Sequence, residues 1–293
     1  MDTEKMYRAY RPMLFSLAYR MLGSVTDAED IVHEAFMAVG RLEPETRLNN
    51  EKAYLCKIVT NRCLNLLHSS AKQREVYVGT WLPEPLVSQW NADTDPSEIY
   101  QQKESLSTAY LLLLQQLNAA ERAVFLLREV FEYSYDEIAD VVGKSSFNCR
   151  QIFHRAKKNI CRRKSSGDAA NTVTESQVRQ FIKALIDGDT GILLQLLAKD
   201  AIHYSDGGGK VQAVPHPVAG AANVIKFYEA LFRWFRAPDS RYSFRIALVN
   251  GSPGLILTID GRVAYVYAFE AMGGRIRTIY AVANPDKLRH MCR

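Results

Sequence analysis

The stretch "YSDGGGKVQAV" brings an acid, three glycines and a lysine together at residues 206–210. A glycine-rich turn that carries a lysine can cradle a phosphate, so this stretch raises the question of nucleotide binding. A phosphate loop, however, continues with serine or threonine and then a helix, whereas Val211 follows Lys210 and both flanks, "AIHYS" and "KVQAV", read as strands. A tight hairpin or bulge with positive φ explains the glycines at least as well, which makes nucleotide binding the weaker interpretation.

Thiol and metal chemistry have little support in the sequence. The five cysteines form no C-x-x-C pair and their number is odd, so neither a disulfide framework nor a zinc site is indicated. We expect reduced thiols, no metal and no cofactor. No apolar run approaches the roughly 18 residues that a membrane span needs, and the N-terminus lacks the apolar region of a signal peptide. These observations predict a cytoplasmic protein without a membrane partner.

Basic residues are concentrated in one block of a chain whose net charge is only +5. Between Lys144 and Lys164 the chain carries eight lysines and arginines and no acid. Such a block is typical of a surface that binds a polyanion such as nucleic acid. A solvated basic helix face is the alternative.

The same block fits a helix-turn-helix. A capping box at Ser134–Glu137 starts a short helix, Gly143 permits a tight turn, and Ser145 caps a second helix. The second helix of such a motif enters the major groove of DNA, and a merely structural helical hairpin is the alternative. We expect DNA contacts from the outward-facing residues Ser145, Ser146, Phe147, Arg150, Gln151, His154, Arg155 and Lys158.

Two N-terminal helices also carry polar faces that suit binding. The helix "TDAEDIVHEAFMAV" begins with a predicted capping box at Thr26, and three carboxylates on one exposed face suit docking to a basic partner: Asp27, Asp30 and Glu34. A solvated helix with acids near its N-terminus is the alternative. In "EKAYLCKIVTNRCLNLLH", amides and cations share a face that suits melted or single-stranded DNA: Lys57, Asn61, Asn65 and His68. Exposed amides are common, so an ordinary solvated face is the alternative there.

Helical blocks and a linker must position these residues. Apolar residues at helical spacing predict nearly continuous helix over 5–72 and again over 105–165. Residues 73–104 contain three prolines and indicate a linker.

The C-terminal block is of a different class. A polar hinge at 164–172 leads into helices around "VRQFIKALI" and "ILLQLLA". Strands are then expected in "YSFRIALV", "LILTI", "RVAYVYAFE" and "RIRTIYAVA". Asn250-Gly251, Asp260-Gly261 and Gly273-Gly274 separate these strands and are typical hairpin turns. Two helices that lead into a curved antiparallel sheet predict an α+β domain.

At this point the chain resembles a family. "YRPMLFSLAYRMLGSVTDAEDIVHEAFMAV" is similar to domain two of bacterial extracytoplasmic-function (ECF) sigma factors, and "AYLCKIVTNRCLNLL" to the segment that reads their minus-ten promoter element. "LNAAERAVFLLREVFEYSYDEIADVVGKSSFNCRQIFHRAKKNI" is similar to domain four, which reads the minus-thirty-five element. "WLPEPL", "DGGGK" and "NPDKL" resemble the subgroup with a SnoaL-like C-terminal domain, called SigJ-type.

The resemblance implies a multidomain fold. Two all-α sigma domains, at 5–72 and at 105–165 with the helix-turn-helix, flank the linker at 73–104, and an α+β SnoaL-like cone domain follows at 173–293. The implied partners are promoter DNA and core RNA polymerase, through its beta-prime clamp helices and beta flap. The acidic face falls where such factors dock on the clamp helices, Asn61 and Asn65 fall in the minus-ten segment, and the helix from Ser146 is the minus-thirty-five reader. Position 65 is often aspartate in the family.

A SnoaL-like domain also implies a cavity that serves enzymes in related proteins. His203, Tyr204 and Asp206 would then be acid–base groups, but such chemistry needs them to converge on one substrate, and they need not share a strand face. A domain that keeps the fold without the chemistry is the favoured interpretation. A bifunctional protein with an active C-terminal domain and a small ligand in its cavity both stay open. A repressor without polymerase is a further alternative, against which the acidic and amide faces argue.

We favour a regulatory contact between the C-terminal domain and the linker, because an aromatic anchor on a stiff, proline-rich turn loses little entropy on binding. In this hypothesis the domain clasps the linker and sets the relative position of the two DNA-binding domains. The residues concerned are Trp81, Leu82, Pro83, Glu84, Pro85, Asp206, Gly207, Gly208, Gly209, Lys210, Asn284, Pro285 and Asp286.

Overall fold

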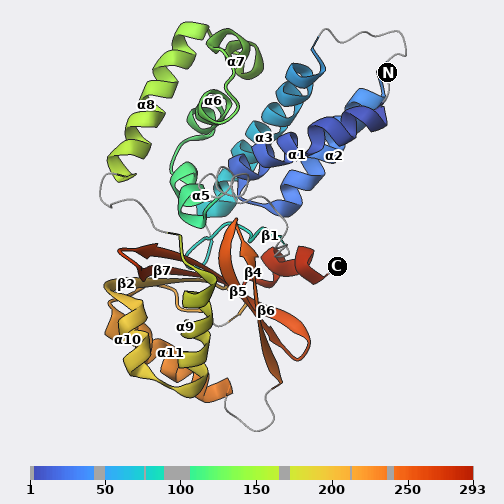
Figure 1. Cartoon of the computed structure of the whole chain (residues 1–293). Helices are drawn as coiled ribbons and strands as arrows, with labels where there is room; N and C mark the ends of the chain where they lie inside the picture. Colours follow the sequence, from blue (N-terminus) through green and yellow to red (C-terminus); the bar gives the residue numbers. More distant parts are fainter. Residues whose placement is uncertain are drawn as a thin grey trace. The chain divides into compact units, whose positions relative to one another are not determined.

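A computed structural model of the chain describes residues 3–42, 50–75, 77–88, 106–164, 172–211, 213–235 and 241–292. Most of the predicted hinge at 164–172 and residues 89–105 of the predicted linker lie outside these ranges. The chain divides into two compact units (Figure 1), which are Met1–Val76 with Leu111–Ser166, and Tyr77–Tyr110 with Gly167–Arg293. The two predicted helical domains therefore share one unit, and their limits stay predictions. None of the helices in the described ranges is long and apolar enough to cross a membrane.

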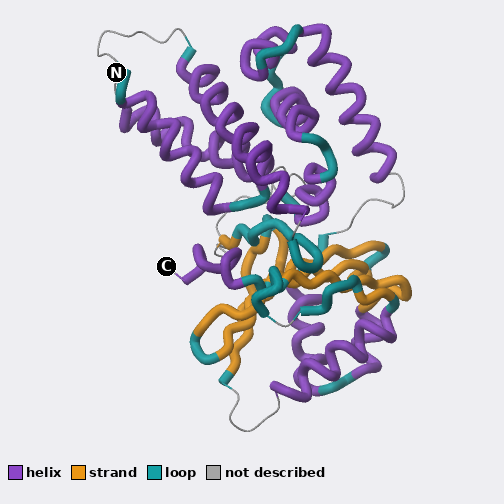
Figure 2. Tube along the Cα trace, turned by 180° about the vertical axis from the view of Figure 1, so that it is seen from behind, coloured by secondary structure: helices purple, strands orange, loops and turns teal. Residues whose placement is uncertain are grey.

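The described part of the first unit consists of helices (Figure 2). Apolar residues at helical spacing, among them Leu14, Leu17 and Val59, form its buried core, as the sequence predicts. Its helices are α1 (Thr3–Leu22), α2 (Val25–Gly40), α3 (Glu51–Glu75), the greater part of α5 (Thr108–Gln115), α6 (Ala119–Glu129), α7 (Tyr135–Val142) and α8 (Ser146–Lys164).

The start of α2 corrects one prediction. Ser24, and not Thr26, caps the helix, because the Ser24 side chain accepts the backbone N–H of Asp27 at 3.1 Å. Gly23 ends α1 with a φ of 70°, which leaves Ser24 in extended conformation at the cap position. Thr26 lies inside the helix, so the predicted capping box there is wrong.

The predicted helix-turn-helix is present as α7 and α8. Ser134 and Glu137 form the predicted capping box, and Gly143 ends α7 with a φ of 65°. The side chain of Ser145 then accepts the backbone N–H of Asn148 at 3.2 Å, which starts α8. Local capping chemistry therefore defines the turn, as the sequence predicts.

Arg122 of α6 holds the helical unit together from inside. Its Nε donates to the Leu114 carbonyl at 2.8 Å and its Nη2 to the Leu117 carbonyl at 3.1 Å, at the end of α5. Its Nη1 donates to the side chain of Gln115 and to the Met21 carbonyl at the end of α1. One guanidinium thus satisfies carbonyls at two helix C-termini, where a positive charge is favoured.

The second unit contains one mixed sheet of seven strands in the order β1-β4-β5-β6-β7-β2-β3. Strands β4 to β7 form an antiparallel meander, and β2 adds parallel to β7. The strands are β1 (Val87–Ser88), β2 (Leu197–Asp206), β3 (Val218–Ala219), β4 (Tyr242–Val249), β5 (Ser252–Ile259), β6 (Arg262–Met272) and β7 (Arg275–Val282). Helices α9 (Glu175–Asp187), α10 (Thr190–Leu196) and α11 (Ala221–Phe235) pack together with the sheet (Figures 1 and 2). A short α12 (Pro285–Leu288) and a 3-10 turn (Arg289–Cys292) follow β7.

The predicted hairpins are confirmed by their backbone. Asn250, Asp260 and the glycines that follow them have positive φ, as do Gly273 and Gly274. Two positive φ angles in succession are the signature of a two-residue hairpin turn whose twist matches the flanking strands. The turn chemistry alone therefore located three of the sheet's connections.

Several elements differ from the predictions. The sheet is mixed rather than antiparallel, α11 was not predicted, and the linker contributes the edge strand β1. The described residues of "KVQAV" form no strand, because the chain turns at Gly208 and Gly209 instead of continuing in the sheet. Between α9, α11 and the sheet lies an aromatic core in which Phe181 makes edge contacts to Tyr228 and Phe269.

The variant Arg122→Met keeps an apolar stem but removes the buried donors. We expect the free energy of unfolding to fall by about 3 kcal/mol, since each buried carbonyl left without a partner costs about 1–3 kcal/mol. Urea unfolding followed by the helical circular dichroism signal measures this. Arg155→Met, which changes an exposed arginine of α8, is the control, and a loss in Arg122→Met no larger than in this control would contradict the role of Arg122.

Candidate functional site

Asp206, the last residue of β2, lies fully buried at the centre of a polar cluster in the second unit. Its Oδ1 accepts the hydroxyl of Tyr77 at 2.5 Å and the backbone N–H of Gly208 at 3.1 Å. Its Oδ2 accepts the backbone N–H of Leu82 at 2.8 Å and the Nζ of Lys287 at 2.7 Å. Four donors from three separate segments therefore converge on one carboxylate, which burial requires.

Lys287 of α12 provides the positive charge of this cluster. Besides Asp206, its Nζ donates to the Leu82 carbonyl. The ammonium also lies 4.3 Å from the ring centre of Trp81 and 4.9 Å from that of Tyr77. A desolvated cation over aromatic faces is attracted by their quadrupoles. Lys287 is itself buried, so it binds both the backbone and the aromatic side chains of the linker at one point.

The three glycines that follow Asp206 permit close backbone approach. Gly208 and Gly209 have φ angles of 59° and 70°, which side chains other than glycine rarely adopt. A Cβ on Gly208 would lie 2.1 Å from the Nδ2 of Asn284, and one on Gly209 would lie 3.1 Å from the Cβ of Val78. The glycines therefore serve contacts within the protein, and the predicted tight turn explains them.

Asn284 joins the end of β7 to the same cluster. Its Nδ2 donates to the Tyr77 hydroxyl at 2.9 Å, and its Oδ1 caps α12 by accepting the N–H of Asp286. Its backbone N–H is bound by the Asp206 carbonyl at 2.9 Å. Burial and the hydrogen bond to Asp206 raise the pKa of Tyr77, so its hydroxyl stays a donor at neutral pH.

The proline-rich linker segment packs along the same unit. Leu82 is fully buried, Pro83, Glu84 and Pro85 are buried, and Trp81 is half-buried. The Pro85 carbonyl lies 2.9 Å from the Nε2 of His290, beyond α12. At the outer edge, exposed Lys210 forms an ion pair with Asp286, two residues after Asn284. The predicted contact residues of the linker, the glycine turn and the C-terminal motif are thus brought together, with Pro285 as the first residue of α12.

A second polar contact, made by Asn250, holds the linker at Leu86. Asn250, in the β4–β5 turn, accepts the backbone N–H of Leu86 at 2.7 Å through its Oδ1 and donates its own N–H to the Leu86 carbonyl at 2.8 Å. Its Nδ2 donates to the Oγ1 of Thr108, the first residue of α5, at 3.2 Å. Asn250 and Thr108 are buried. One amide therefore connects Leu86, within the predicted linker, to Thr108, which follows it.

Glu270 of β6 adds to the contact at the start of α5. Its carboxylate accepts the backbone N–H of Ala109 and, at 3.1 Å, the hydroxyl of Tyr280. An acid at a helix N-terminus is favoured by the free N–H groups there. Burial nevertheless raises the pKa of Glu270, while the bonds from Tyr280 and Ala109 oppose that rise.

The candidate acid–base groups do not converge. His203 faces the helices, where its Nδ1 lies 3.2 Å from the Tyr228 hydroxyl, and burial lowers the pKa of His203 to about 4. Tyr204 stacks on Tyr280, and Asp206 binds the linker. Residues 203 and 206 occupy opposite faces of β2, because side chains alternate along a strand. His203, Tyr204 and Asp206 therefore do not form one convergent acid–base site.

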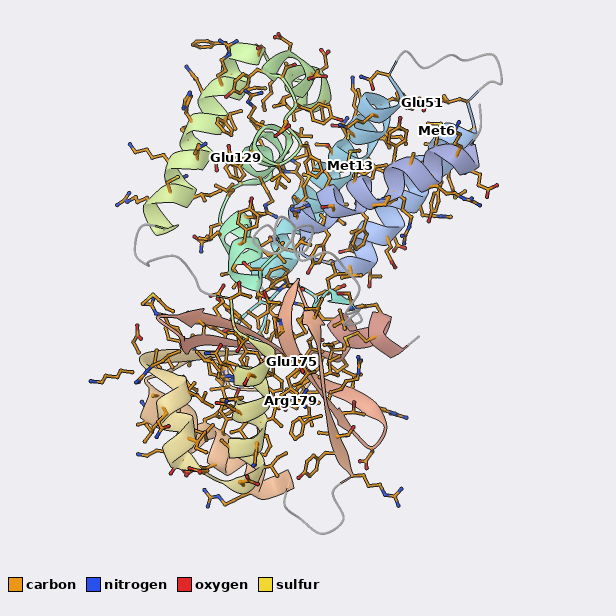
Figure 3. The ribbon with its side chains drawn as sticks, viewed as in Figure 1. Met6, Met13, Glu51, Glu129, Glu175 and Arg179 are labelled. Atoms are coloured by element: carbon orange, nitrogen blue, oxygen red, sulfur yellow. The ribbon has the colours of Figure 1, made fainter. Side chains whose placement is uncertain are left out.

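The same unit has a separate open groove of about 640 Å³ between α9 and β4. Its apolar lining comes from Ile182, Ile186, Phe244 and Ile246. Glu175 and Arg179 of α9, labelled in Figure 3, form an ion pair and also line the groove. The three candidate acid–base residues are not part of this lining.

In the helical unit, the predicted acidic face is exposed. Asp27, Asp30 and Glu34 all reach solvent from α2, within about 60° around the helix axis. Glu34 forms a surface ion pair with Arg62 of α3, so part of the negative charge of Glu34 is already neutralised by the chain itself. The face keeps the geometry of a docking surface for a basic partner.

The predicted amide face of α3 is exposed as well. Lys57, Asn61, Asn65 and His68 reach solvent within about 80° around the helix axis. The opposite side of the helix buries its apolar residues, among them Leu55. The four side chains can therefore face a nucleic acid together.

Helix α8 presents the predicted basic face. Phe147, Arg150, Gln151, His154, Arg155 and Lys158 are exposed, Ser145 lies at the cap and Ser146 is partly covered. The guanidinium of Arg150 stacks 5.3 Å from the ring centre of Tyr135, which orients it. Lys157 is instead bound by Glu129 of α6 at 3.0 Å, and Figure 3 labels Glu129.

Comparisons with known proteins agree with this arrangement. Residues 6–73 match the family model of sigma-70 region 2, and residues 107–160 match that of sigma-70 region 4. The chain is 33% identical to the ECF RNA polymerase sigma factor SigJ of Mycobacterium tuberculosis over 96% of this chain and 91% of that protein. It is 27% identical to the probable ECF RNA polymerase sigma factor SigI of the same species, over 96% and 93%. The crystal structure of SigJ matches 97% of this chain and 98% of its own, with a TM-score of 0.76 and 29% identity.

Asp206→Ala and Lys287→Met test the buried ion pair. We expect each variant to lower the free energy of unfolding by roughly 3–5 kcal/mol, because each leaves a buried charge without its partner. The double variant should lose clearly less than the sum of the two. Urea unfolding measures the cycle, and hydrogen exchange at the Leu82 amide should rise in Asp206→Ala. The solvent-accessible pair of Asp200 in β2 and Arg277 in β7 is the control, with an expected coupling below about 1 kcal/mol. Additive losses at Asp206 and Lys287 would contradict the pairing.

Glu270→Gln tests how much burial of the charged Glu270 carboxylate lowers the stability of the folded chain. The pKa of Glu270 is raised in the folded chain, so its contribution to stability is present below the unfolded value of about 4.3 and is lost as the pH rises through the folded value. We expect Glu270→Gln to be more stable than the wild type at pH 7 and to lose this advantage below about pH 4. Tyr280→Phe, which removes a bond favouring the charged form, should shift the wild-type pH dependence upward. Thermal melts across this range measure both, and a Glu270→Gln effect independent of pH would exclude the assignment.

Proposed function

This chain belongs to the ECF family of RNA polymerase sigma factors, proteins that act in transcription initiation with the polymerase, and from this premise we propose that its C-terminal domain controls promoter-specific transcription by holding the linker. The observation that carries the proposal is the buried carboxylate of Asp206, which binds Tyr77, Leu82 and Lys287 together. The linker segment is thus a structural part of the SnoaL-like unit.

The first step of the proposed function is docking on core polymerase. Asp27, Asp30 and Glu34 form the acidic face that would contact the beta-prime clamp helices, and the beta flap would receive domain four. The exposure of the three acids on one face of α2 supports this role. Opposite charge across an interface mainly accelerates and orients encounter.

The second step is promoter reading at two elements. The amide face of α3, with Asn61 and Asn65, would read the melted minus-ten element, where unpaired base edges are available for hydrogen bonds. Helix α8 would enter the major groove at the minus-thirty-five element, with Arg155 and Lys158 near phosphates and bases. The exposure of both faces supports these roles.

The third step is control through the linker. The first side of the linker is bound by Asp206 and Lys287, and Asn250 connects Leu86 to Thr108 at the start of domain four. Leu82 and Leu86 of the linker, and Thr108 shortly after it, are therefore held on the C-terminal unit by buried hydrogen bonds. A change in these contacts alters the freedom with which the two reading domains can reach their promoter elements.

Transcription in vitro with core RNA polymerase tests the proposal. The full chain is compared with a chain ending within 165–172, a chain ending before Asn284, and the variants Asp206→Ala and Trp81→Ala. We expect core-dependent transcripts from a library of paired promoter elements. Asp206→Ala, Trp81→Ala and the chain ending before Asn284 should change the yield in the same direction, because all three remove contacts of one cluster. Asp200→Ala, which loses only a solvent-accessible ion pair with Arg277 outside the cluster, is the control and should leave the yield nearly unchanged.

The outcomes separate the parts of the proposal. Unchanged transcription in both Asp206→Ala and Trp81→Ala would overturn control through the linker while leaving promoter-specific transcription intact. An absence of core-dependent transcripts from every version would overturn promoter-specific transcription itself.

A further inference from the structure

Phe147 is an aromatic side chain that is not packed into the core of the helical unit. It is 71% exposed, the largest exposed fraction among the large apolar side chains in the described ranges. It is the second residue of α8, directly after the cap that Ser145 provides. A single exposed apolar side chain is common on protein surfaces, so the position of Phe147 at the start of α8, and not its exposure alone, points to a partner.

The helix geometry separates Phe147 from the core. The buried side of α8 includes Cys149, Ile152 and Ala156, and Ala156 lies about 180° around the helix from Phe147. No rotation of the helix within its packing could bury Phe147. Its neighbours along the exposed stripe are Gln151, His154 and Lys158, all within about 40° of it: a polar and basic set.

This stripe defines the chemistry of the partner. Amide, imidazole and ammonium groups suit the edges of bases and their phosphates, and no acid interrupts the helix. The N-terminal residues of a recognition helix reach base edges in the major groove. The apolar group that the major groove presents there is the 5-methyl group of thymine.

We propose that Phe147 reads thymine in the upstream promoter element by covering its 5-methyl group. The inference rests on the proposed function, since it requires α8 to enter the major groove. Contact with the ring removes the methyl group and part of the Phe147 ring from water, and a pyrimidine without that methyl group loses this gain. Phe147 is therefore a specificity-determining residue, distinct from the cationic residues that bind phosphate.

The test uses holoenzyme assembled from the full chain and core polymerase. A duplex library randomised across the upstream element is selected for binding, and the best site is then resynthesised with deoxyuridine in place of each thymine in turn. Uracil pairs as thymine does and lacks only the methyl group. At one or two positions we expect the replacement to weaken binding about fourfold, the value of one buried methyl group at about 0.8 kcal/mol. In Phe147→Ala this difference should vanish at those positions.

Three further variants make the result specific. Phe147→Leu keeps an apolar side chain and should retain part of the preference for thymine. Lys158→Ala should weaken binding to all sequences alike, lower the salt slope by about 0.9, and leave the thymine preference intact. Leu194→Ala removes an equally unneeded exposed apolar side chain in the other unit and should change nothing.

The possible results are distinguishable. Insensitivity of the wild type to every uracil replacement overturns the inference, although a selected sequence still supports the proposed function. A thymine preference that Phe147→Ala retains also overturns it, as does a loss in Phe147→Ala that is equal at all sequences, which would indicate a backbone or protein contact. Failure to select any sequence overturns the proposed function and the inference with it.

Discussion

A buried carboxylate that must be neutralised is the constraint on which the C-terminal unit depends. Removing a carboxylate and an ammonium from water costs several kcal/mol for each ion, and their attraction repays this only when every remaining polar site is satisfied. Asp206 reaches that condition through Tyr77, Leu82 and Gly208, and Lys287 through a carbonyl and two aromatic faces. The linker, the glycine turn and the C-terminal motif therefore depend on one another electrostatically. Removing any one of them leaves a buried charge without one of its partners.

Local chemistry explains which parts of the fold the sequence could predict. Helices with an apolar stripe, the capping box at Ser134 and the paired positive φ angles of the hairpins depend on neighbours within a few residues, and all appear as predicted. Thr26 failed as a cap because Ser24 stood in the extended conformation that Gly23 leaves behind. The parallel pairing of β2 with β7 and the edge strand β1 join segments far apart in the chain, and no local pattern marks them.

In the candidate site, too, features set by local sequence were predictable and contacts between distant segments were not. The short motifs located the linker, the turn and the C-terminal segment, yet the residues that connect them were missed: Tyr77, Lys287, Asn250 and His290. Lysine is usually a surface residue, and nothing beside Lys287 indicates burial between two rings of the linker. Its partner Leu82 is 205 residues away, so only the folded chain reveals the pair. The exposed faces of α2, α3 and α8 were predictable because each is a property of one helix.

The order of synthesis determines when the Asp206 cluster can form. A ribosome adds roughly 5–20 residues per second, so about 10–40 seconds separate the appearance of Leu82 from that of Lys287. Helix α3 precedes Leu82 in the chain and α8 is completed within that interval, while the linker still lacks the ammonium that the Leu82 carbonyl and the rings of Tyr77 and Trp81 bind. A nascent chain therefore passes through a period in which α3 and α8 exist before the Asp206 cluster can form, and the cluster is completed only as β7 and α12 emerge.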